Sequence, residues 1–216
     1  MGSKHMLLWR PPDRSIGVFA RAGVDAIARR LEGVGAREAT VHATVRPPPR
    51  ATLVPFRRDP VALVSIRGDE DALGRARIAL STLPGKVEAW SVDESVPVAR
   101  AGVVGATLLT LFRKHPRIDR ELFFARWYGE HTPLTLEVHP VVGYVRNAIV
   151  APLLHGSAPH DGIVTEDFAE ARDLTSLRLF GRGPRALWNA VRIGRHISTF
   201  LDLRTIETWL VEERRL

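Results

Sequence analysis

The sequence predicts an α+β fold in which two ferredoxin-like β-α-β-β-α-β units form one barrel. Strand-like alternation and helix-like periodicity follow the same order in both halves of the 216-residue chain. This order is typical of a ferredoxin-like unit, a four-stranded antiparallel sheet with two helices on one face. Such a unit alone leaves its other sheet face partly apolar and wet, whereas two units packed sheet against sheet bury both faces. We therefore expect a fused pseudo-dimer, with one unit at residues 7–98 and the other at residues 104–216.

The strands and helices of the first unit can be recognised from the residues at their ends. The apolar run LLWR ends at two prolines, which is typical of a strand. Ser15 can cap a helix whose apolar residues keep a period of about 3.6 residues until Gly33. A later segment begins with helix-favouring acids and stops at Pro84 and Gly85. The expected strands are residues 7–10, 37–45, 60–68 and 86–92, and the expected helices are residues 15–31 and 69–83.

The second unit follows a linker at residues 93–105 and repeats the order. Asp119 is a candidate N-cap for its first helix, which Pro133 could break because proline lacks a backbone donor. Its second helical stretch is interrupted between Gly181 and Pro184. The expected strands are residues 106–114, 143–150, 161–168 and 206–214, and helical material is expected at residues 119–138 and 174–201.

Composition excludes several kinds of site and location. The chain has no cysteine, which excludes disulfides, thiolate zinc sites and cysteine nucleophiles. No apolar run approaches the roughly 20 residues that span a bilayer, so we expect no membrane segment. Residues 1–6, MGSKHM, are too short and polar for a signal peptide and look like a cloning remnant. We therefore expect a cytoplasmic protein.

The net charge of +7 does not indicate a nucleic-acid partner. Of the 31 basic residues, 28 are Arg and 3 are Lys, and they are spread along the chain among acids. The densest basic patch, residues 46–58, looks like a proline-rich loop. No nucleic-acid recognition motif accompanies it, so we expect no such partner. A general positive field could instead attract an anionic small substrate.

One stretch, FFARWYGEHTPL at residues 123–134, combines large aromatics with a histidine. In a helix, Phe123, Trp127 and His131 recur every four positions and share one face. His131 then has two interpretations. It either packs in the core and hydrogen-bonds a strand carbonyl, or it carries protons, for which an imidazole with a pKa of about 6.5 is suited at neutral pH.

The second half resembles the EthD family of the dimeric α/β barrel superfamily. Four motifs occur in the family's order between about residue 106 and residue 213: FFARWYGEHTPL, PVVGYVRN, DGIVTEDF and RHISTFLDL, the last followed by a strand ending VEE. The first half matches by element order only, because its helix VDAIARRLEGV lacks the Trp and the His. The resemblance therefore implies a barrel whose first half is a degenerate repeat, with one site per chain in the second half.

The resemblance also implies where the site lies. In these barrels the pocket lies between a unit's sheet and its helices, so His131 is expected to point into it as a general base. Tyr144 follows His131 by thirteen residues, as in lactone-isomerising relatives, and could stabilise an enolate oxygen, or serve as an ordinary core aromatic. Strand alternation puts Tyr144 and Asn147 on opposite faces, which makes Asn147 the weaker candidate. The other substrate-binding candidates are Phe123, Trp127 and Phe168 as walls, His139 at the mouth, Glu166 as an acid or base partner of His131, and His196 on the second helix.

We expect a cofactor-independent isomerase, cyclase or lyase that acts on a small enolisable carbonyl compound, since removal of a proton next to a carbonyl begins all three reactions. One alternative is a monooxygenase on the same barrel, either cofactor-free or haem-dependent, because one axial histidine would suffice for haem. Another is a non-catalytic, small-molecule-binding pseudo-dimer. The sequence contains no HExxH, GxSxG or phosphate-loop motif, so no metal is expected. The expected partner is a small-molecule substrate, and the expected assembly is a monomeric pseudo-dimer or a homodimer.

Overall fold

Eight strands close into one antiparallel barrel in the order β1-β3-β2-β8-β5-β7-β6-β4. The computed structural model describes residues 3–36, 38–50, 52–175, 177–181 and 183–216. Met1 and Gly2 of the expected cloning remnant, Arg37 of an expected strand, and positions 176 and 182 of the expected helical stretch lie outside the described residues. The strands are β1 (Ser3–Arg10), β2 (Glu38–Ala43), β3 (Ala62–Gly68), β4 (Lys86–Val98), β5 (Ala106–Phe112), β6 (Val141–Pro152), β7 (Gly162–Phe168) and β8 (Glu207–Arg215).

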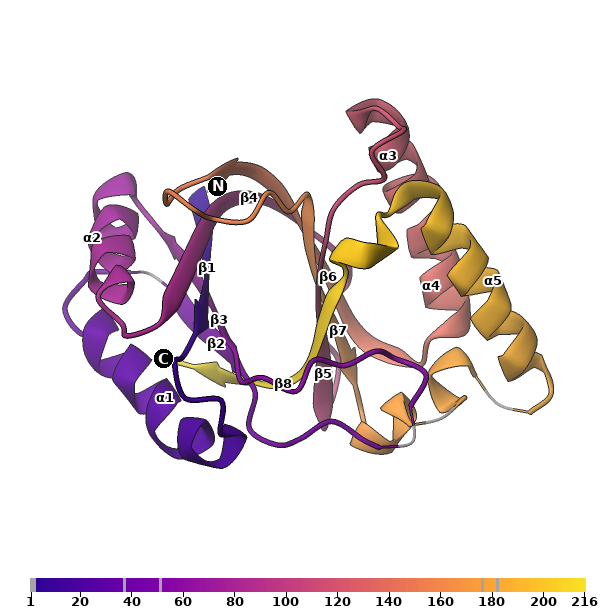
Figure 1. Cartoon of the computed structure of the whole chain (residues 1–216), viewed down its shortest axis with the longest axis horizontal. Helices are drawn as coiled ribbons and strands as arrows, with labels where there is room; N and C mark the ends of the chain where they lie inside the picture. The colour runs from indigo at the N-terminus through magenta and orange to yellow at the C-terminus, as the bar shows by residue number, and fades with distance from the viewer. Residues whose placement is uncertain (1–2, 37, 51, 176, 182) are drawn as a thin grey trace.

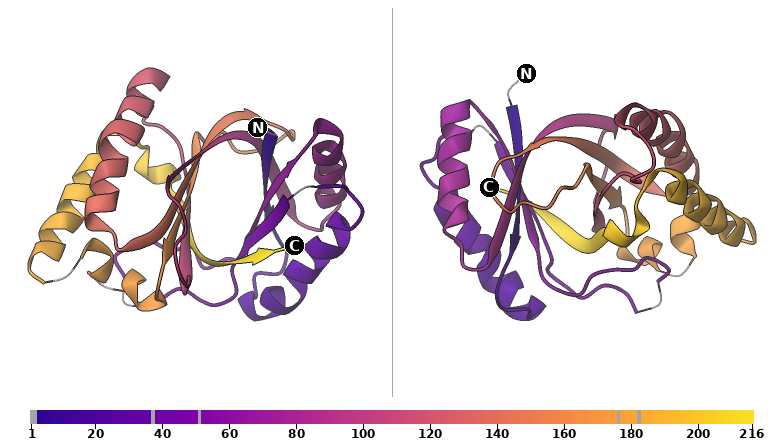
Figure 2. Two further views of the ribbon diagram at one scale, coloured as in Figure 1. Left: turned by 180° about the vertical axis from the view of Figure 1, so that it is seen from behind. Right: turned by 45° about the horizontal axis from the view of Figure 1, so that its top comes forward.

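The predicted fold class is confirmed. Each half contributes one ferredoxin-like sheet, with the orders β4-β1-β3-β2 and β8-β5-β7-β6. The two sheets join at the pairs β2–β8 and β4–β6, where the second and fourth strands of one unit meet the fourth and second of the other. Figures 1 and 2 show the resulting barrel between two groups of helices, one group from each half.

The helices lie where the periodicity predicts them. Asp69 and Asp119 cap the first turns of their helices by accepting hydrogen bonds from Ala72 N and Leu122 N, both at 2.8 Å. The first half carries α1 (Ile16–Leu31) and α2 (Glu70–Ser81), and the second carries α3 (Arg120–Phe124), the π-helix η1 (Ala125–His131), α4 (Thr132–Val138), the short 3₁₀ segments η2 (Ala171–Leu174), η3 (Arg178–Phe180) and η4 (Leu203–Thr205), and α5 (Arg185–Phe200).

Strand alternation divides the apolar residues between the barrel interior and the helix-covered outer faces. In β1, Met6 and Leu8 belong to a buried cluster built only from strands of both halves and the residue that precedes β3, which is the barrel interior. Leu7 and Trp9 belong instead to the cluster shared with α1 and α2. This second cluster fills the space between the first sheet and its helices.

β1 and β4 extend well beyond their predicted ends because polar side chains point into the barrel. β1 begins at Ser3 rather than at residue 7, so part of the expected cloning remnant belongs to the sheet. The Lys4 ammonium is buried and donates to the Glu94 carboxylate and to Asn147 Oδ1, the latter at 2.7 Å. β4 continues to Val98 through the first part of the expected linker. A charged residue at an interior position interrupts the alternation of apolar and polar residues in the sequence. The strand ends were predicted from that alternation, so both strands were predicted too short.

Pro133 does not break the first helix of the second half. The helix runs from α3 into η1 and then α4, and Thr132 N donates to Trp127 O, five residues back. A π-turn is wider than an α-turn, and here it lies directly before Pro133, which has no backbone donor of its own. The helix therefore continues as one element, with His131 at the junction between η1 and α4.

A network of charges closes one end of the barrel. Glu213 of β8 accepts two hydrogen bonds from the Arg100 guanidinium, at 2.6 Å and 2.8 Å, and lies 3.3 Å from His42 Nε2. Arg100 Nε also donates to Asp167, which in turn accepts from Thr107 Oγ1 at 2.6 Å. His42 first, and then Arg100, hold the pKa of Glu213 at about 2 against an ordinary value of 4.5.

This depressed pKa predicts an acid-sensitive contribution to stability. The contribution is fully present above the unfolded-state pKa and is lost as the pH falls from about 5 towards 2. We expect Glu213→Gln to lower the free energy of unfolding by about 2 kcal/mol at pH 7 and by much less at pH 3. Urea unfolding at both pH values measures this difference. Glu212→Gln is the control, because Glu212 pairs with Arg46 at the surface; an equal loss from Glu213→Gln at both pH values would contradict the prediction.

Candidate active site

A cavity of about 540 Å³ lies between the second sheet and its helices. Its floor comes from the outward-facing side chains of β5 to β8, and its roof comes from η1, η3 and α5. Most of the lining is apolar; the exceptions are two histidines, one tyrosine, one glutamate and two threonines. The residues present therefore define an apolar chamber with a few titratable groups.

The aromatic wall of the cavity is held by ring contacts from the core. Trp127 lines the cavity and meets Phe112 edge-on, with ring centroids 5.0 Å apart. Phe123 is fully buried 5.4 Å from Trp127, and the structure places it behind that wall rather than on it. Phe168 also lies off the wall, in the apolar cluster beneath η2 and η3 at the end of β7. Of the three predicted wall residues, the cavity lining thus includes Trp127.

His131 lines the cavity as a neutral imidazole. Its Nε2 lies 3.3 Å from Thr135 Oγ1, whereas its Nδ1 is buried without a hydrogen-bond partner among the described residues. Burial, and then the charges of His196 and His139, lower its pKa to about 3. A group with so low a pKa is a poor general base near neutral pH. It can still offer a hydrogen bond from an uncharged ring.

His196 lies behind His131 rather than in the cavity lining. The two rings are 5.4 Å apart, and both contact Phe200 of the same helix, α5. His196 Nε2 lies 3.9 Å from Glu130, towards the surface. We therefore give His196 no contact with substrate.

His139 and Glu166 form a hydrogen-bonded couple inside the cavity. His139 is the C-cap of α4, where its backbone N–H donates to Thr135 O at 2.7 Å and fixes the residue. Its Nδ1 lies 2.8 Å from Glu166 Oε2 on β7, and both side chains are about nine-tenths buried. Its Nε2 is buried with no partner among the described residues. The predicted partner of Glu166 was His131, and the structure pairs it with His139.

Tyr144 stands next to this couple. It is paired with Glu166 across β6 and β7, and its side chain is fully buried on the same face. Burial, and then the negative charge of Glu166, raise the pKa of Tyr144 above its ordinary value. The phenol is therefore protonated and can act as a hydrogen-bond donor.

Asn147 lies on the other side of the sheet, as alternation predicts. Its Oδ1 accepts a hydrogen bond from Lys4, and its Nδ2 lies 3.4 Å from Ile163 O inside the barrel. Asp167 points inward in the same way, while Glu166 points outward. Asn147 therefore lies on the opposite face of the sheet from the cavity, outside the described lining.

The first half contributes to the cavity in a way that the sequence analysis missed. Leu53, Val54 and Pro55, from the loop between β2 and β3, line it together with Leu179 and Phe180 of η3. No local pattern links this loop to the second half, because the contact depends on how the two sheets close.

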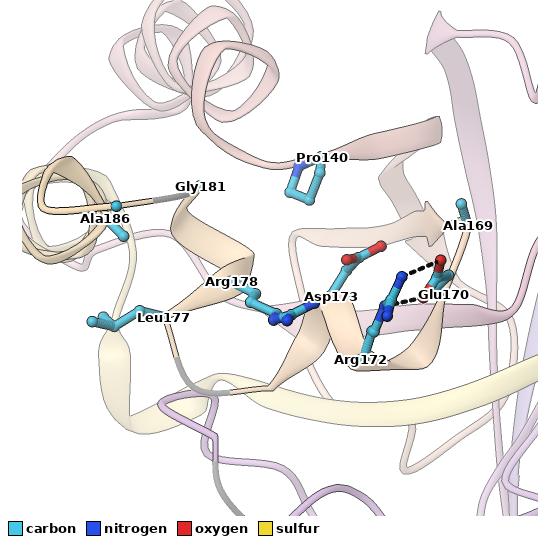
Figure 3. Close-up of a pocket in the computed structure, with 10 residues that line it drawn as sticks. Pro140, Ala169, Glu170, Arg172, Asp173, Leu177, Arg178, Gly181 and Ala186 are labelled. Carbon is cyan, nitrogen blue, oxygen red and sulfur yellow. Dashed lines mark hydrogen bonds and ion pairs between the residues drawn. The ribbon is translucent and has the colours of Figure 1, made fainter.

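A larger groove of about 850 Å³ lies on the outside of η2 and η3 (Figure 3). Its side chains are mostly exposed and include the Arg172–Glu170 ion pair and the exposed Arg178. Its described lining contains neither a histidine nor a buried titratable group. The smaller cavity, with its more apolar lining and its buried titratable groups, is therefore the better candidate active site.

Taken together, the residues that line the cavity do not suit haem. His139 offers one unpaired nitrogen, and its contact with Glu166 matches the usual support of a metal-ligating histidine. The described lining, however, contains no Lys or Arg, and its one carboxylate would repel the two carboxylates of haem. We therefore derive no step through haem. The described residues also contain no group of three or more His, Asp or Glu arranged to hold a metal ion.

The fold is shared with several solved structures. An anthrone oxidase-like protein is similar over 99% of this chain and 93% of its own, with a TM-score of 0.61 and 11% identity. The chain has the dimeric α/β barrel fold. A "putative monooxygenase" from Lactobacillus acidophilus NCFM is similar over 98% of this chain and 93% of its own, with a TM-score of 0.51 and 8% identity. Identities this low relate the folds alone.

The other comparisons with known proteins support no further conclusion. A chlorite dismutase from Candidatus Nitrospira defluvii in complex with imidazole has a TM-score of 0.46 and 13% identity, over 98% of this chain and 90% of its own, too low a similarity to support an argument. No family model matches the sequence, and no curated protein matches it. The resemblance to the EthD family therefore stays a prediction. Within the described part of the chain, no helix is both long and apolar enough to cross a bilayer.

Proposed function

We propose that the chain is a cofactor-independent enzyme that removes a proton from a neutral, enolisable aromatic carbonyl compound, and that dioxygen oxidises the resulting carbanion. The observation that carries the proposal is the His139–Glu166 couple, which leaves one imidazole nitrogen unpaired at the wall of an apolar cavity. Isomerisation, cyclisation and cleavage begin with the same proton removal and remain the alternatives.

His139 is the general base in this proposal. An ionised Glu166 carboxylate can only accept hydrogen bonds, so the Nδ1 of His139 donates to it and the Nε2 carries the free lone pair. The carboxylate also stabilises the imidazolium that forms when Nε2 takes the substrate proton. His131, the base expected from the sequence, lacks such a partner and has a pKa of about 3.

Tyr144 and His131 stabilise the oxyanion. The enolate oxygen gains negative charge as the proton leaves, and hydrogen-bond donors in a water-poor site stabilise that charge strongly. Tyr144 stays protonated because its pKa is raised, and His131 is an uncharged imidazole because its pKa is about 3. Each can therefore donate a hydrogen bond to the oxyanion without transferring its proton. Both side chains line the same cavity as His139.

The lining favours a neutral substrate. A volume of about 540 Å³ lies within the usual range for small-molecule pockets, roughly 300 to 1,000 Å³. The described lining contains no Lys or Arg to receive an anion, and Glu166 would repel one. The positive charge of the chain as a whole therefore gives no reason to expect an anionic substrate in this chamber.

Oxidation by dioxygen requires no further reductant if the reacting carbon carries two hydrogens. The carbanion adds dioxygen and is protonated to a hydroperoxide at the same carbon. Loss of the second hydrogen of that carbon as a proton then expels hydroxide from the O–O bond and forms a ketone. One oxygen atom ends in the ketone and the other in water, so atoms and electrons balance. Because an anthrone oxidase-like protein shares this fold, anthrone is the compound with which we test this fate of the carbanion.

Anthrone, a neutral three-ring ketone with an activated methylene group, is the test substrate. We expect the purified chain to consume one dioxygen for each anthrone converted to anthraquinone, at a rate that added haemin does not raise. An oxygen electrode and the absorbance of the quinone follow both species. No acceleration over buffer would contradict the proposal, and proton exchange without oxygen uptake would favour isomerase or lyase chemistry.

A further inference from the structure

We infer that residues 46–50 and 52–58 of the first half, here called the strap, select the substrate of the cavity in the second half. The inference rests on the proposed function. It assigns to the degenerate repeat a role in the one site that the chain carries, beyond completing the barrel.

The composition of the strap makes it a stiff, sheet-avoiding segment. It contains Pro47, Pro48, Pro49 and Pro55, each of which has a fixed φ and no backbone donor. The strap lies within residues 44–61, between β2 and β3, about twice the length of the equivalent connection between β6 and β7 at residues 153–161. Figure 1 shows this loop reaching across β8 and β5 towards the short helical segments of the second half.

Both ends of the strap are tied to the second half. At one end, Arg46 Nη2 donates to Gly105 O at 2.5 Å. At the other end, Arg57 N donates to Thr208 O of β8 at 2.8 Å, and the Arg57 guanidinium pairs with Asp59 at 3.1 Å. The middle of the strap is therefore held over the outer face of the second sheet.

The middle of the strap forms a wall of the cavity. Val54 and Phe56 pack on the apolar cluster that includes Leu108, Leu179 and Leu210. Val54 also lines the cavity, beside Leu53, whose side chain remains 57% exposed. An apolar side chain that is both exposed and part of the lining lies at the mouth. Leu53 and Val54 therefore set the width of the entrance and the room left for a substrate.

The test measures binding separately from turnover. Prodan, a neutral two-ring aromatic ketone whose emission shifts in apolar surroundings, is the binding probe, and anthrone is the substrate. We expect Val54→Trp to fill part of the cavity, to weaken prodan binding by about tenfold and to raise the KM for anthrone with little change in kcat. We expect Leu53→Ala to widen the mouth and to raise kcat/KM for 1,8-dihydroxyanthrone relative to anthrone by about fivefold.

Arg50→Ala is the matched control, because Arg50 is an exposed strap residue outside the lining. Unchanged prodan binding in folded Val54→Trp, or an equal loss in Arg50→Ala, would overturn the inference. If Val54→Trp does not fold, Leu53→Trp at the exposed mouth makes the same test. If the wild-type chain does not oxidise anthrone, the proposed function fails, while the prodan results still decide whether the strap forms the wall.

Discussion

Replacing His139 with alanine should lower kcat for anthrone by about 10² to 10⁴ while leaving the fold intact. The variant removes an imidazole whose Nδ1 contacts a carboxylate and whose Nε2 has no partner, and the described cavity lining contains no second one. His139 is the C-cap of α4 and holds that position through its backbone N–H, which alanine retains. Steady-state rates, with circular dichroism to verify folding, measure the effect.

Two further variants separate this assignment from its rivals. Glu166→Gln keeps an acceptor for Nδ1 but removes the charge that stabilises the imidazolium, so we expect a loss of about 10² in kcat. His131→Ala should cost less than about tenfold, because a histidine with a pKa of about 3 contributes as a donor and not as the base. A loss from His131→Ala as large as that from His139→Ala would return the role of base to His131.

Tyr144→Phe should lower kcat by about 10², with KM changing much less. The substitution removes one hydroxyl and keeps the ring that packs against Val164 and Trp127 in the core. If the hydroxyl stabilises charge only in the transition state, kcat falls and substrate binding persists.

The chain's other tyrosine provides the control for this variant. Tyr128 is half-buried on η1, with the Arg146 guanidinium 3.9 Å from its ring centroid, and it does not line the cavity. Tyr128→Phe should leave kcat within about twofold of the wild type. Equal losses in both variants would show that the effect is structural, and no loss in Tyr144→Phe would remove Tyr144 from the oxyanion site.

The fold was predictable because it depends on the spacing of apolar residues and on the residues that begin and end each helix and strand, and both can be recognised locally in the sequence. Alternation, short apolar runs and turn residues predicted the eight strands, and the acids at Asp69 and Asp119 marked two helix starts. The sequence could not predict the ends of β1 and β4, since Lys4 and Glu94 neutralise one another across the barrel. The continuity of the helix through Pro133 also escaped prediction, because a π-turn has no sequence signal of its own.

The candidate site was predictable only in part. The stretch that contains Trp127 and His131 does line the cavity, and alternation separated Tyr144 from Asn147 as the structure has them. The His139–Glu166 couple could not be found in the same way. It joins a helix end to a strand 27 residues later, and its formation depends on the register of β7 beside β6.

The central claim, that His139 removes a proton from an enolisable ketone, is tested most directly without dioxygen. Anthrone incubated anaerobically in D₂O should exchange its methylene hydrogens in the presence of the wild-type chain, as followed by proton NMR. His139→Ala should slow this exchange by about 10² or more. Exchange by the wild-type chain no faster than in buffer, or exchange unaffected by His139→Ala, would contradict the claim.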